Sequence, residues 1–338
     1  MCIVDMNEKC RLLMNENHST SYINTQVYLY EQQEYPRIAG ELQNLIARKY
    51  NISAESVFLV NGIDEAIYLF CSWLKEMGSC LLYDIPNYCG LLDIVDLMSM
   101  PAIAYNQNQE KYDEKLLYLE LERNPQVKAV YLCNPRNPSG NCISTIDSIL
   151  QNHRLKKCVF FLDEAYAEFV EREYNYSANF LQCSRVIIAR TFSKAYGLAG
   201  IRVGYIMTEE KAFKEYLERF RKMQPYHLSI YSLKAAIEAL RNEDRMYASV
   251  DNINKNRIRI FRAFEELDIH YYPSSTNFVT FIVDDVCQLL EYMSLNKLLI
   301  ANLENFKMSN CARVSVGNDD ETTLFINCLK KYYEERKI

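Results

Sequence analysis

Short apolar runs alternate with amphipathic stretches from Val57 onward, and this alternation constrains the fold more than any other feature of the chain. Apolar runs of about four to eight residues, separated by helical segments, are typical of a parallel sheet wrapped by helices. The pattern predicts an α/β fold with a seven-stranded, mostly parallel sheet. We expect the strands at residues 57–60, 79–83, 102–105, 128–133, 158–162, 185–190 and 202–207.

The pattern changes after about Met223, where longer helical stretches replace the regular alternation. Two helices are expected first, and short strands and a final helix follow them. This order of elements is typical of a smaller α+β unit. The expected helices span residues 228–240, 253–267 and 320–333, and the expected strands span 278–283, 298–300 and 312–316.

Composition excludes several classes of function. The 338 residues carry a net charge of −6, and no Lys/Arg cluster resembles a track for a nucleic-acid backbone. No apolar stretch approaches the roughly 20 residues of a membrane span, and the N-terminus lacks a signal-peptide core, so we expect a cytoplasmic protein. The 12 cysteines form no Cys-x-x-Cys pair and the four histidines have no ligand-like spacing, so we expect reduced thiols and no metal.

Three polar segments each follow an expected strand. The carboxyl ends of parallel strands form the crevice in which α/β sheets bind their ligands, so we expect these segments to meet there. Asn134–Gly140 follows the run 129–133, Asp163–Tyr166 follows the run 158–162, and Lys194 follows the run 186–189.

The segment 191–205 indicates the chemistry of that crevice. Lysine forms Schiff bases with aldehyde cofactors, which makes Lys194 a candidate nucleophile. An arginine and neighbouring hydroxyls, here Arg202, Thr191 and Ser193, are the groups that hold a cofactor phosphate. A Ser-Lys pair alone is typical of a surface turn, whereas the whole segment with its upstream partners favours a cofactor site.

These motifs resemble those of fold-type I pyridoxal-5′-phosphate (PLP) enzymes of the aspartate aminotransferase superfamily. Within it they are most similar to the histidinol-phosphate aminotransferase family, from about Leu12 to about Tyr333. The resemblance implies a PLP-dependent transferase fold of type I. It also implies an N-terminal arm at 1–30 that contributes to the small domain, a large PLP-binding domain at 31–225 and a small domain at 226–338.

The resemblance also implies a role for each residue of the cofactor site. Lys194 would bind the aldehyde and transfer the proton, Asp163 would pair with the pyridine nitrogen, and Tyr166 with Asn137 would donate to the phenolate oxygen. Asp163 as a helix cap and the Asn-Pro segment as simple turn chemistry are the structural alternatives. The other implied contacts are Tyr88 on the ring, the Ile63 and Asp64 amides, Thr191, Ser193 and Arg202 at the phosphate, and Tyr35 from the partner subunit of a homodimer.

Fewer residues concern the substrate. Arg313 resembles the arginine that holds a substrate anion, and Asn17 belongs to an Asn-Glu-Asn segment in which His18 replaces the usual proline. Ala301 occupies the expected place of a second arginine. That substitution has two interpretations, a changed substrate or a shifted alignment of the loop.

The resulting hypothesis is a cytoplasmic, homodimeric PLP-dependent aminotransferase of the histidinol-phosphate type, with 2-oxoglutarate and glutamate as the expected amino-group pair. One alternative is an aminotransferase for aromatic or other amino acids. Another is a threonine-phosphate-type decarboxylase on the same scaffold. A non-catalytic binding protein is disfavoured because Lys194, Asp163, Tyr166, Asn137 and Arg202 are all present.

Overall fold

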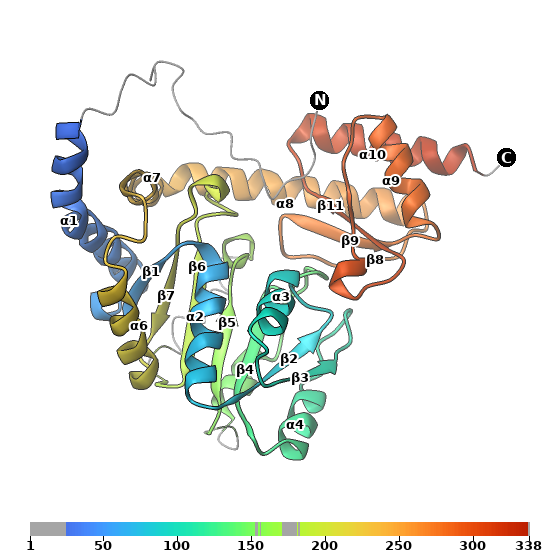
Figure 1. Ribbon diagram of the computed structural model, residues 1–338. Helices are drawn as coiled ribbons and strands as arrows, with labels where there is room; N and C mark the ends of the chain where they lie inside the picture. Colours follow the sequence, from blue (N-terminus) through green and yellow to red (C-terminus); the bar gives the residue numbers. More distant parts are fainter. Residues whose placement is uncertain (1–24, 153–154, 156, 171–180, 182, 337–338) are drawn as a thin grey trace.

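Seven strands form the central sheet of the computed structural model, which describes residues 25–152, 155, 157–170, 181 and 183–336 (Figure 1). Their order is β1-β7-β6-β5-β4-β2-β3, and β7 alone runs antiparallel to its neighbours. The predicted mostly parallel sheet is confirmed, with every boundary within two residues. The strands are β1 (Val57–Val60), β2 (Cys80–Ile85), β3 (Ala102–Asn106), β4 (Val127–Cys133), β5 (Val159–Asp163), β6 (Val186–Thr191) and β7 (Gly204–Thr208).

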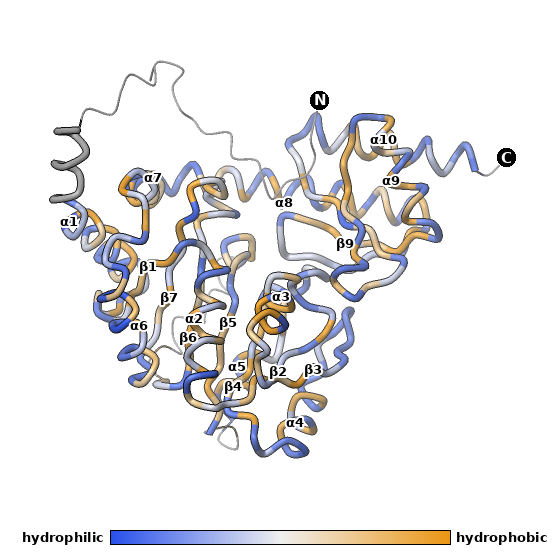
Figure 2. The backbone as a smooth tube through the Cα atoms, viewed as in Figure 1, coloured by the Kyte–Doolittle hydropathy of each residue, from blue (hydrophilic) through white to orange (hydrophobic). Residues whose placement is uncertain are grey.

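Helices cover both faces of this sheet, which explains why most residues of its strands are apolar. Alternate residues of a strand face opposite sides. On β6, Val186 and Ile188 face the core shared with α1 (Thr25–Tyr50), whereas Ile187 and Ala189 face the core shared with α2 (Gly62–Glu76). Figure 2 shows hydrophobic residues along α3 and the strands of the sheet. The other helices of this part are α3 (Cys89–Leu97), α4 (Glu114–Arg123), α5 (Ile146–Gln151), α6 (Lys211–Met223) and α7 (Ile230–Arg241).

A long helix, α8 (Glu243–Glu266), runs from the large sheet to a smaller lobe (Figure 1). That lobe contains an antiparallel sheet of order β10-β11-β9-β8 with its own apolar core. The strands are β8 (Tyr271–Tyr272), β9 (Phe278–Ile282), β10 (Ala301–Asn302) and β11 (Cys311–Ser315), and the helices are α9 (Val286–Leu295) and α10 (Asp319–Glu334).

Two predictions in this lobe need correction. Helix α8 begins at Glu243 rather than at residue 253, because its first turns bury little beyond Met246 and Val250 and therefore lack a clear apolar period. The strand expected at 298–300 lies at 301–302 instead. Leu298 is buried in the core of the lobe, which accounts for the apolar signal that suggested a strand there.

The domain division at residues 30 and 225 stays a prediction. Helix α7 contacts α1, and its Leu233 and Ala236 belong to the apolar core on the α1 side of the large sheet. A division at residue 225 would assign α7 to the smaller lobe, although its packing partners lie in the large one. Among the described helices, none is both long and apolar enough to cross a bilayer.

Candidate active site

A cavity of about 90 Å³ lies at the carboxyl ends of β4, β5 and β6. The order of the strands explains its position, because β4, β5 and β6 are parallel neighbours whose ends meet at one edge. Ten of the residues predicted to form the cofactor site line this cavity, together with Cys133 and Ala165. The ten are Ile63, Asp64, Tyr88, Asn137, Asp163, Tyr166, Thr191, Ser193, Lys194 and Arg202.

Lys194 lies in the turn that follows β6, and its Nζ is 5.5 Å from the centre of the Tyr166 ring. Burial, together with the positive charge of Arg313, lowers the pKa of Lys194 to about 8. A pKa of about 8 leaves about one lysine in ten neutral at pH 7, against roughly three in ten thousand at the ordinary value. The cavity therefore holds an amine that can act as a nucleophile and a base near neutral pH.

Asp163 ends β5 and is buried. One carboxylate oxygen accepts a hydrogen bond from the Tyr131 hydroxyl, and the other accepts from the Ala165 amide at 3.0 Å. Burial raises the pKa of Asp163 to about 6, although both hydrogen bonds oppose that shift. A carboxylate held in this way is a fixed partner for a protonated ring nitrogen.

The carboxylate of Asp64 joins Arg202 and Tyr88. Arg202 Nη2 lies 2.8 Å from Asp64 Oδ2, and the Tyr88 hydroxyl donates to Asp64 Oδ1 at 2.8 Å. The guanidinium lies against Gly62, where an added Cβ would be 2.4 Å from Arg202 Nη2. Gly62 also has a φ of +79°, which favours glycine.

Beside this group, the Thr191 hydroxyl donates to Ser193 Oγ at 2.9 Å. Two hydroxyls, a guanidinium and the amides at the start of α2 thus converge on one end of the cavity. Such a combination suits a phosphate group.

The smaller lobe contacts Asn137, one of the residues that line the cavity. Arg313, on β11, donates from Nη1 to Asn137 Oδ1 at 2.8 Å, and its guanidinium lies between the rings of Phe278 and Phe306 at 4.8 and 4.9 Å. The Tyr166 ring meets Phe278 edge-on, and burial raises the pKa of Tyr166, which keeps its hydroxyl protonated as a donor. Arg313 does not line the cavity itself, but it contacts Asn137, which does.

Ala301 pairs directly with Arg313 across β10 and β11. Directly opposed residues of an antiparallel pair project from the same face, with Cβ atoms about 4.5–5.5 Å apart. Ala301 is therefore the cross-strand neighbour of Arg313 and adds no charge beside its guanidinium.

Two predicted residues lie elsewhere. Asn17 lies outside the described residues. Tyr35 is buried away from the cavity of its own chain, where its hydroxyl accepts from the Leu228 amide at 3.3 Å and its ring contacts Tyr226.

The prediction missed Tyr131 and Cys133. Both lie in the last three positions of β4, two residues apart and therefore on one face of the strand. Their proximity to the strand end was the signal that could have identified them.

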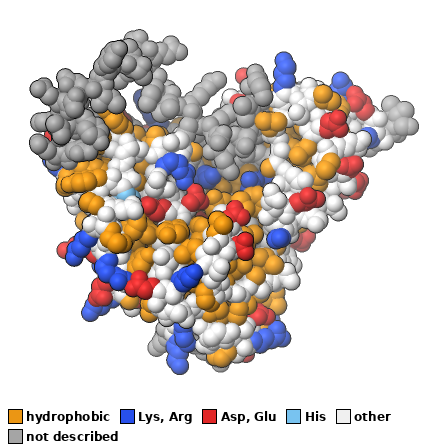
Figure 3. All heavy atoms as spheres, viewed as in Figure 1, with side chains coloured by type: hydrophobic (Ala, Val, Ile, Leu, Met, Phe, Trp, Pro, Cys, Tyr) orange, Lys and Arg blue, Asp and Glu red, His pale blue; other side chains and the backbone are white. Residues whose placement is uncertain are grey.

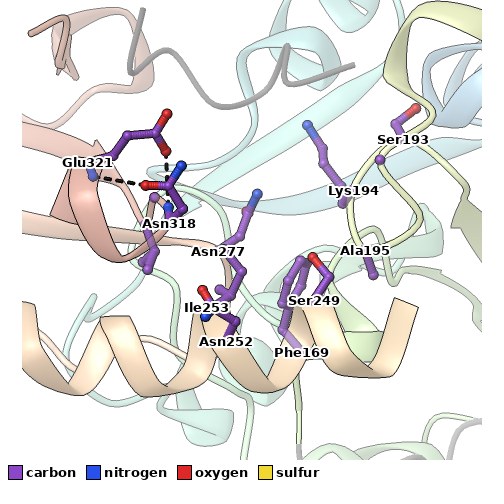
Figure 4. A pocket seen from close by; sticks show the side chains of 13 residues that line it. Phe169, Ser193, Lys194, Ala195, Ser249, Asn252, Ile253, Asn277, Asn318 and Glu321 are labelled. Atoms are coloured by element: carbon purple, nitrogen blue, oxygen red, sulfur yellow. Dashed lines mark hydrogen bonds between the residues drawn. The ribbon is translucent and has the colours of Figure 1, made fainter. Parts of the chain in front are cut away.

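Lys194 also lines a second cavity, of about 260 Å³ (Figure 4). Ser249 and Asn252 of α8 line it, as do Asn277 and the start of α10, where Asn318 and Glu321 cap each other (Figure 4). Lys194 and Ser193 therefore contribute to both cavities. No group of three or more His, Cys, Asp or Glu side chains within the described ranges is arranged to hold a metal ion.

Comparison with known proteins connects this geometry to a family. The sequence profile of the family Aminotransferase class I and II matches residues 31–328. A Legionella pneumophila protein named histidinol-phosphate aminotransferase 2 is 32% identical over 300 residues, which cover 86% of this chain and 79% of the relative.

Solved structures with the same fold include two different kinds of enzyme. The histidinol-phosphate aminotransferase of Clostridium acetobutylicum superposes with a TM-score of 0.81 at 20% identity, covering 92% of this chain and 95% of that one. The L-threonine-O-3-phosphate decarboxylase of Porphyromonas gingivalis superposes with a TM-score of 0.75 at 21% identity, covering 92% and 96%.

Proposed function

Because the chain belongs to the class I and II aminotransferases, we propose that the cavity at the ends of β4, β5 and β6 is its active site. The protein is a PLP-dependent aminotransferase similar to histidinol-phosphate aminotransferases. One observation carries the assignment of the site: the amine of Lys194, the carboxylate of Asp163 and the guanidinium of Arg202 line a single cavity.

The residues of the cavity fit the functional groups of PLP. When bound, PLP supplies an aldehyde that condenses with an amine and a ring that withdraws electrons from the substrate Cα. Lys194 would bind the aldehyde, and Asp163 would hold the proton on the ring nitrogen. Asn137 and Tyr166 would donate to the phenolate oxygen, and the Tyr88 ring would lie against the cofactor ring.

The phosphate would bind at the Gly62 end. Arg202 would supply charge, Thr191 and Ser193 would supply hydroxyls, and α2 would supply the Ile63 and Asp64 amides. Asp64 already accepts from Arg202 and Tyr88, so its carboxylate would share both partners with the phosphate.

Lys194 would also transfer the proton during the reaction. Its Nζ would take the proton from the substrate Cα, and the lowered pKa of about 8 supports this role because a neutral amine is needed. Lys194 would return the proton on the cofactor side, and one water would then hydrolyse the bond to the substrate carbon, which would release the oxo product and leave the amino group with the cofactor. The expected acceptor and donor are 2-oxoglutarate and glutamate.

Histidinol phosphate is the first candidate for the amine substrate, supported by the names of the relatives. Arg313 would hold its phosphate, and Asn17 is a further proposed contact. The second candidate is an amino acid with an apolar or aromatic side chain, whose carboxylate Arg313 would bind. The Ala301–Arg313 pairing favours it, because a single guanidinium beside Phe278 and Phe306 suits a monoanion with an apolar neighbour.

The working unit would be a cytoplasmic homodimer in which Tyr35 contributes to the partner's phosphate site. Tyr226 and Tyr231 support an interface near α1 and α7, because their side chains are 58% and 64% exposed.

All ten cysteines within the described residues are free thiols, in keeping with a reducing compartment. On the face drawn in Figure 3, acidic and basic side chains are interspersed, which supports small-molecule substrates over nucleic acid.

A single-turnover absorbance measurement tests the proposal. The PLP-loaded protein is mixed in turn with histidinol phosphate, glutamate, phenylalanine and threonine phosphate, and conversion to the pyridoxamine form is followed. Conversion by glutamate and one amine substrate is expected. Covalent PLP retained by Lys194→Ala after dialysis would contradict the assigned lysine, and release of CO₂ from threonine phosphate would identify a decarboxylase instead.

A further inference from the structure

A buried ion pair joins the two loops that flank the proposed ring site. Arg136 Nη2 lies 2.9 Å from Asp84 Oδ2, and the two side chains are only 3% and 4% exposed. Asp84 lies near the end of β2, and Arg136 lies in the turn that follows β4, the parallel neighbour of β2. The pair therefore links two adjacent strand ends at the edge of the sheet where the cavity opens.

Each partner makes further bonds that restrain its own loop. Arg136 Nη1 donates to the Asn108 carbonyl at 2.7 Å, and its guanidinium lies over the Tyr112 ring. The other oxygen of Asp84 accepts from Asn87 Nδ2 at 3.0 Å. Asn87 Oδ1 in turn accepts from the Tyr88 amide at 2.7 Å.

The two ends of this chain of bonds are cavity residues. Tyr88 follows Asn87 directly, and Asn137 follows Arg136 directly. The ion pair thus connects the loop of the proposed ring-stacking tyrosine to the loop of a proposed phenolate donor. Tyr88 is connected to Asn137 through side-chain hydrogen bonds and one peptide unit, so the two residues have little freedom to move relative to each other.

The smaller lobe holds the same turn from its other side. Thr280 Oγ1 donates to the Pro138 carbonyl at 2.5 Å, and the Ser275 amide donates to the Gly140 carbonyl at 2.7 Å. Arg313 donates to Asn137 Oδ1, so Asn137 Nδ2 is the side-chain atom that can donate to an anionic oxygen. The Arg136–Asp84 pair supplies the large-sheet side of this restraint.

Stability alone gives little reason for such a pair. Two charges removed from water regain roughly what their desolvation costs, and apolar residues of similar volume often stabilise a core equally well. Charged hydrogen bonds fix the direction of the side chains that form them, whereas contacts between apolar residues do not. The pair is therefore better explained by the positions it fixes than by the energy it contributes.

We infer that Arg136 and Asp84 are positioning residues that hold Asn137 and Tyr88 against the cofactor ring. This inference rests on the proposed function, because it takes PLP to bind in this cavity. A donor held on the phenolate oxygen stabilises that anion and lowers the proton affinity of the nitrogen that Lys194 contributes. Loosening the pair should therefore raise that proton affinity and weaken the stacking of the ring.

The test replaces both partners at once, in the double variant Arg136→Met with Asp84→Leu, so that no unpaired charge is buried. The pH midpoint of the cofactor's absorbance change should rise by about one unit, which is a tenfold change in proton affinity. The dissociation constant of PLP from the cofactor-free protein, followed by fluorescence quenching, should increase about tenfold. Asp84→Asn preserves the volume and an oxygen that can accept from Arg136, although it leaves the Arg136 charge unneutralised, so it should move both quantities in the same direction by less.

Tyr112→Phe is the matched control. It removes the hydroxyl bonded to Tyr105 but keeps the ring beneath Arg136, so it should lower the melting temperature without moving the pH midpoint. Asn137→Ala removes the proposed donor itself, so it should raise the pH midpoint. This variant tests whether the measurement responds to the loss of that donor.

The outcomes separate the inference from the proposed function. A midpoint that moves in Asn137→Ala but stays at the unaltered value in both the double variant and Asp84→Asn would overturn the positioning role alone. If the double variant does not fold, Asp84→Asn decides the question by itself. The absence of any titrating band that depends on Lys194 would overturn the proposed site, and the inference with it.

Discussion

Replacing Ala301 by arginine should change which substrate anion the protein prefers. Ala301 is half-buried and pairs directly with Arg313, so both side chains project from the same face of the small sheet. An arginine at position 301 would place a second guanidinium beside the first. A phosphate dianion could then bind to both, whereas a carboxylate needs only one.

The magnitude follows from two opposing terms. A charged hydrogen bond contributes about 1.5–3 kcal/mol, which corresponds to a roughly 10- to 150-fold increase in kcat/KM for a phosphate-bearing amine. Two guanidinium groups about 5 Å apart repel each other by about 3 kcal/mol at an effective dielectric constant of about 20. A dianion offsets that repulsion and a monoanion does so only in part, so kcat/KM for phenylalanine should stay level or fall.

The assay compares kcat/KM for histidinol phosphate and for phenylalanine, with 2-oxoglutarate as acceptor, in the unaltered protein and in Ala301→Arg. Ala301→Gln controls for side-chain length, because glutamine adds reach without charge. A ratio of the two kcat/KM values that changes by less than about threefold in a PLP-loaded Ala301→Arg protein would refute the reasoning. So would an equal gain in Ala301→Gln.

Three further outcomes are expected. Lys194→Ala should bind PLP without covalent attachment and lose transamination by at least about four orders of magnitude, as checked by dialysis and single-turnover kinetics. Asp163→Asn should abolish turnover yet stabilise the cofactor-free protein at pH 7 by about 1–3 kcal/mol in denaturant titrations. The pKa of Asp163 is about 6 in the folded protein, above its ordinary value of 3.8, so the folded state of the unaltered protein binds more protons than the unfolded state. The unaltered protein therefore loses stability as the pH rises from 4 to 6, and Asp163→Asn should lack this loss. Gly62→Ala should weaken PLP binding and lower stability by about 1–2 kcal/mol, because φ is +79° and the new Cβ would meet Arg202; equal PLP affinity in calorimetry would contradict this.

The strands of the large sheet could be predicted because their signal is local. Each contains a short, mainly apolar run, and in central strands such as β6 burial on both faces keeps the apolar residues consecutive. The start of α8 could not be predicted in the same way. Its first turns cross between the two lobes, so only Met246 and Val250 are buried there and the helical period is lost among exposed residues.

The candidate site shows the same contrast. Lys194, Asp163 and Asn137 each follow a strand directly, so their convergence follows from the order of parallel strands. The bonds of Asp64 to Arg202 and Tyr88 depend on side-chain directions in three separate segments. The sequence suggested only the backbone amide of Asp64, because nothing in the local pattern reveals where its carboxylate points.

This difference explains why the cofactor is easier to identify than the substrate. The cofactor side is built from neighbouring strand ends, each recognisable from a few consecutive residues. The proposed substrate side depends on the register between β10 and β11 and on the approach of the smaller lobe to Asn137. If Arg313 binds the substrate anion as proposed, its cross-strand pairing with Ala301 sets how much positive charge faces that anion. A single substitution there can alter substrate preference without disturbing Lys194, Asp163 or Arg202, since none of these belongs to the small sheet.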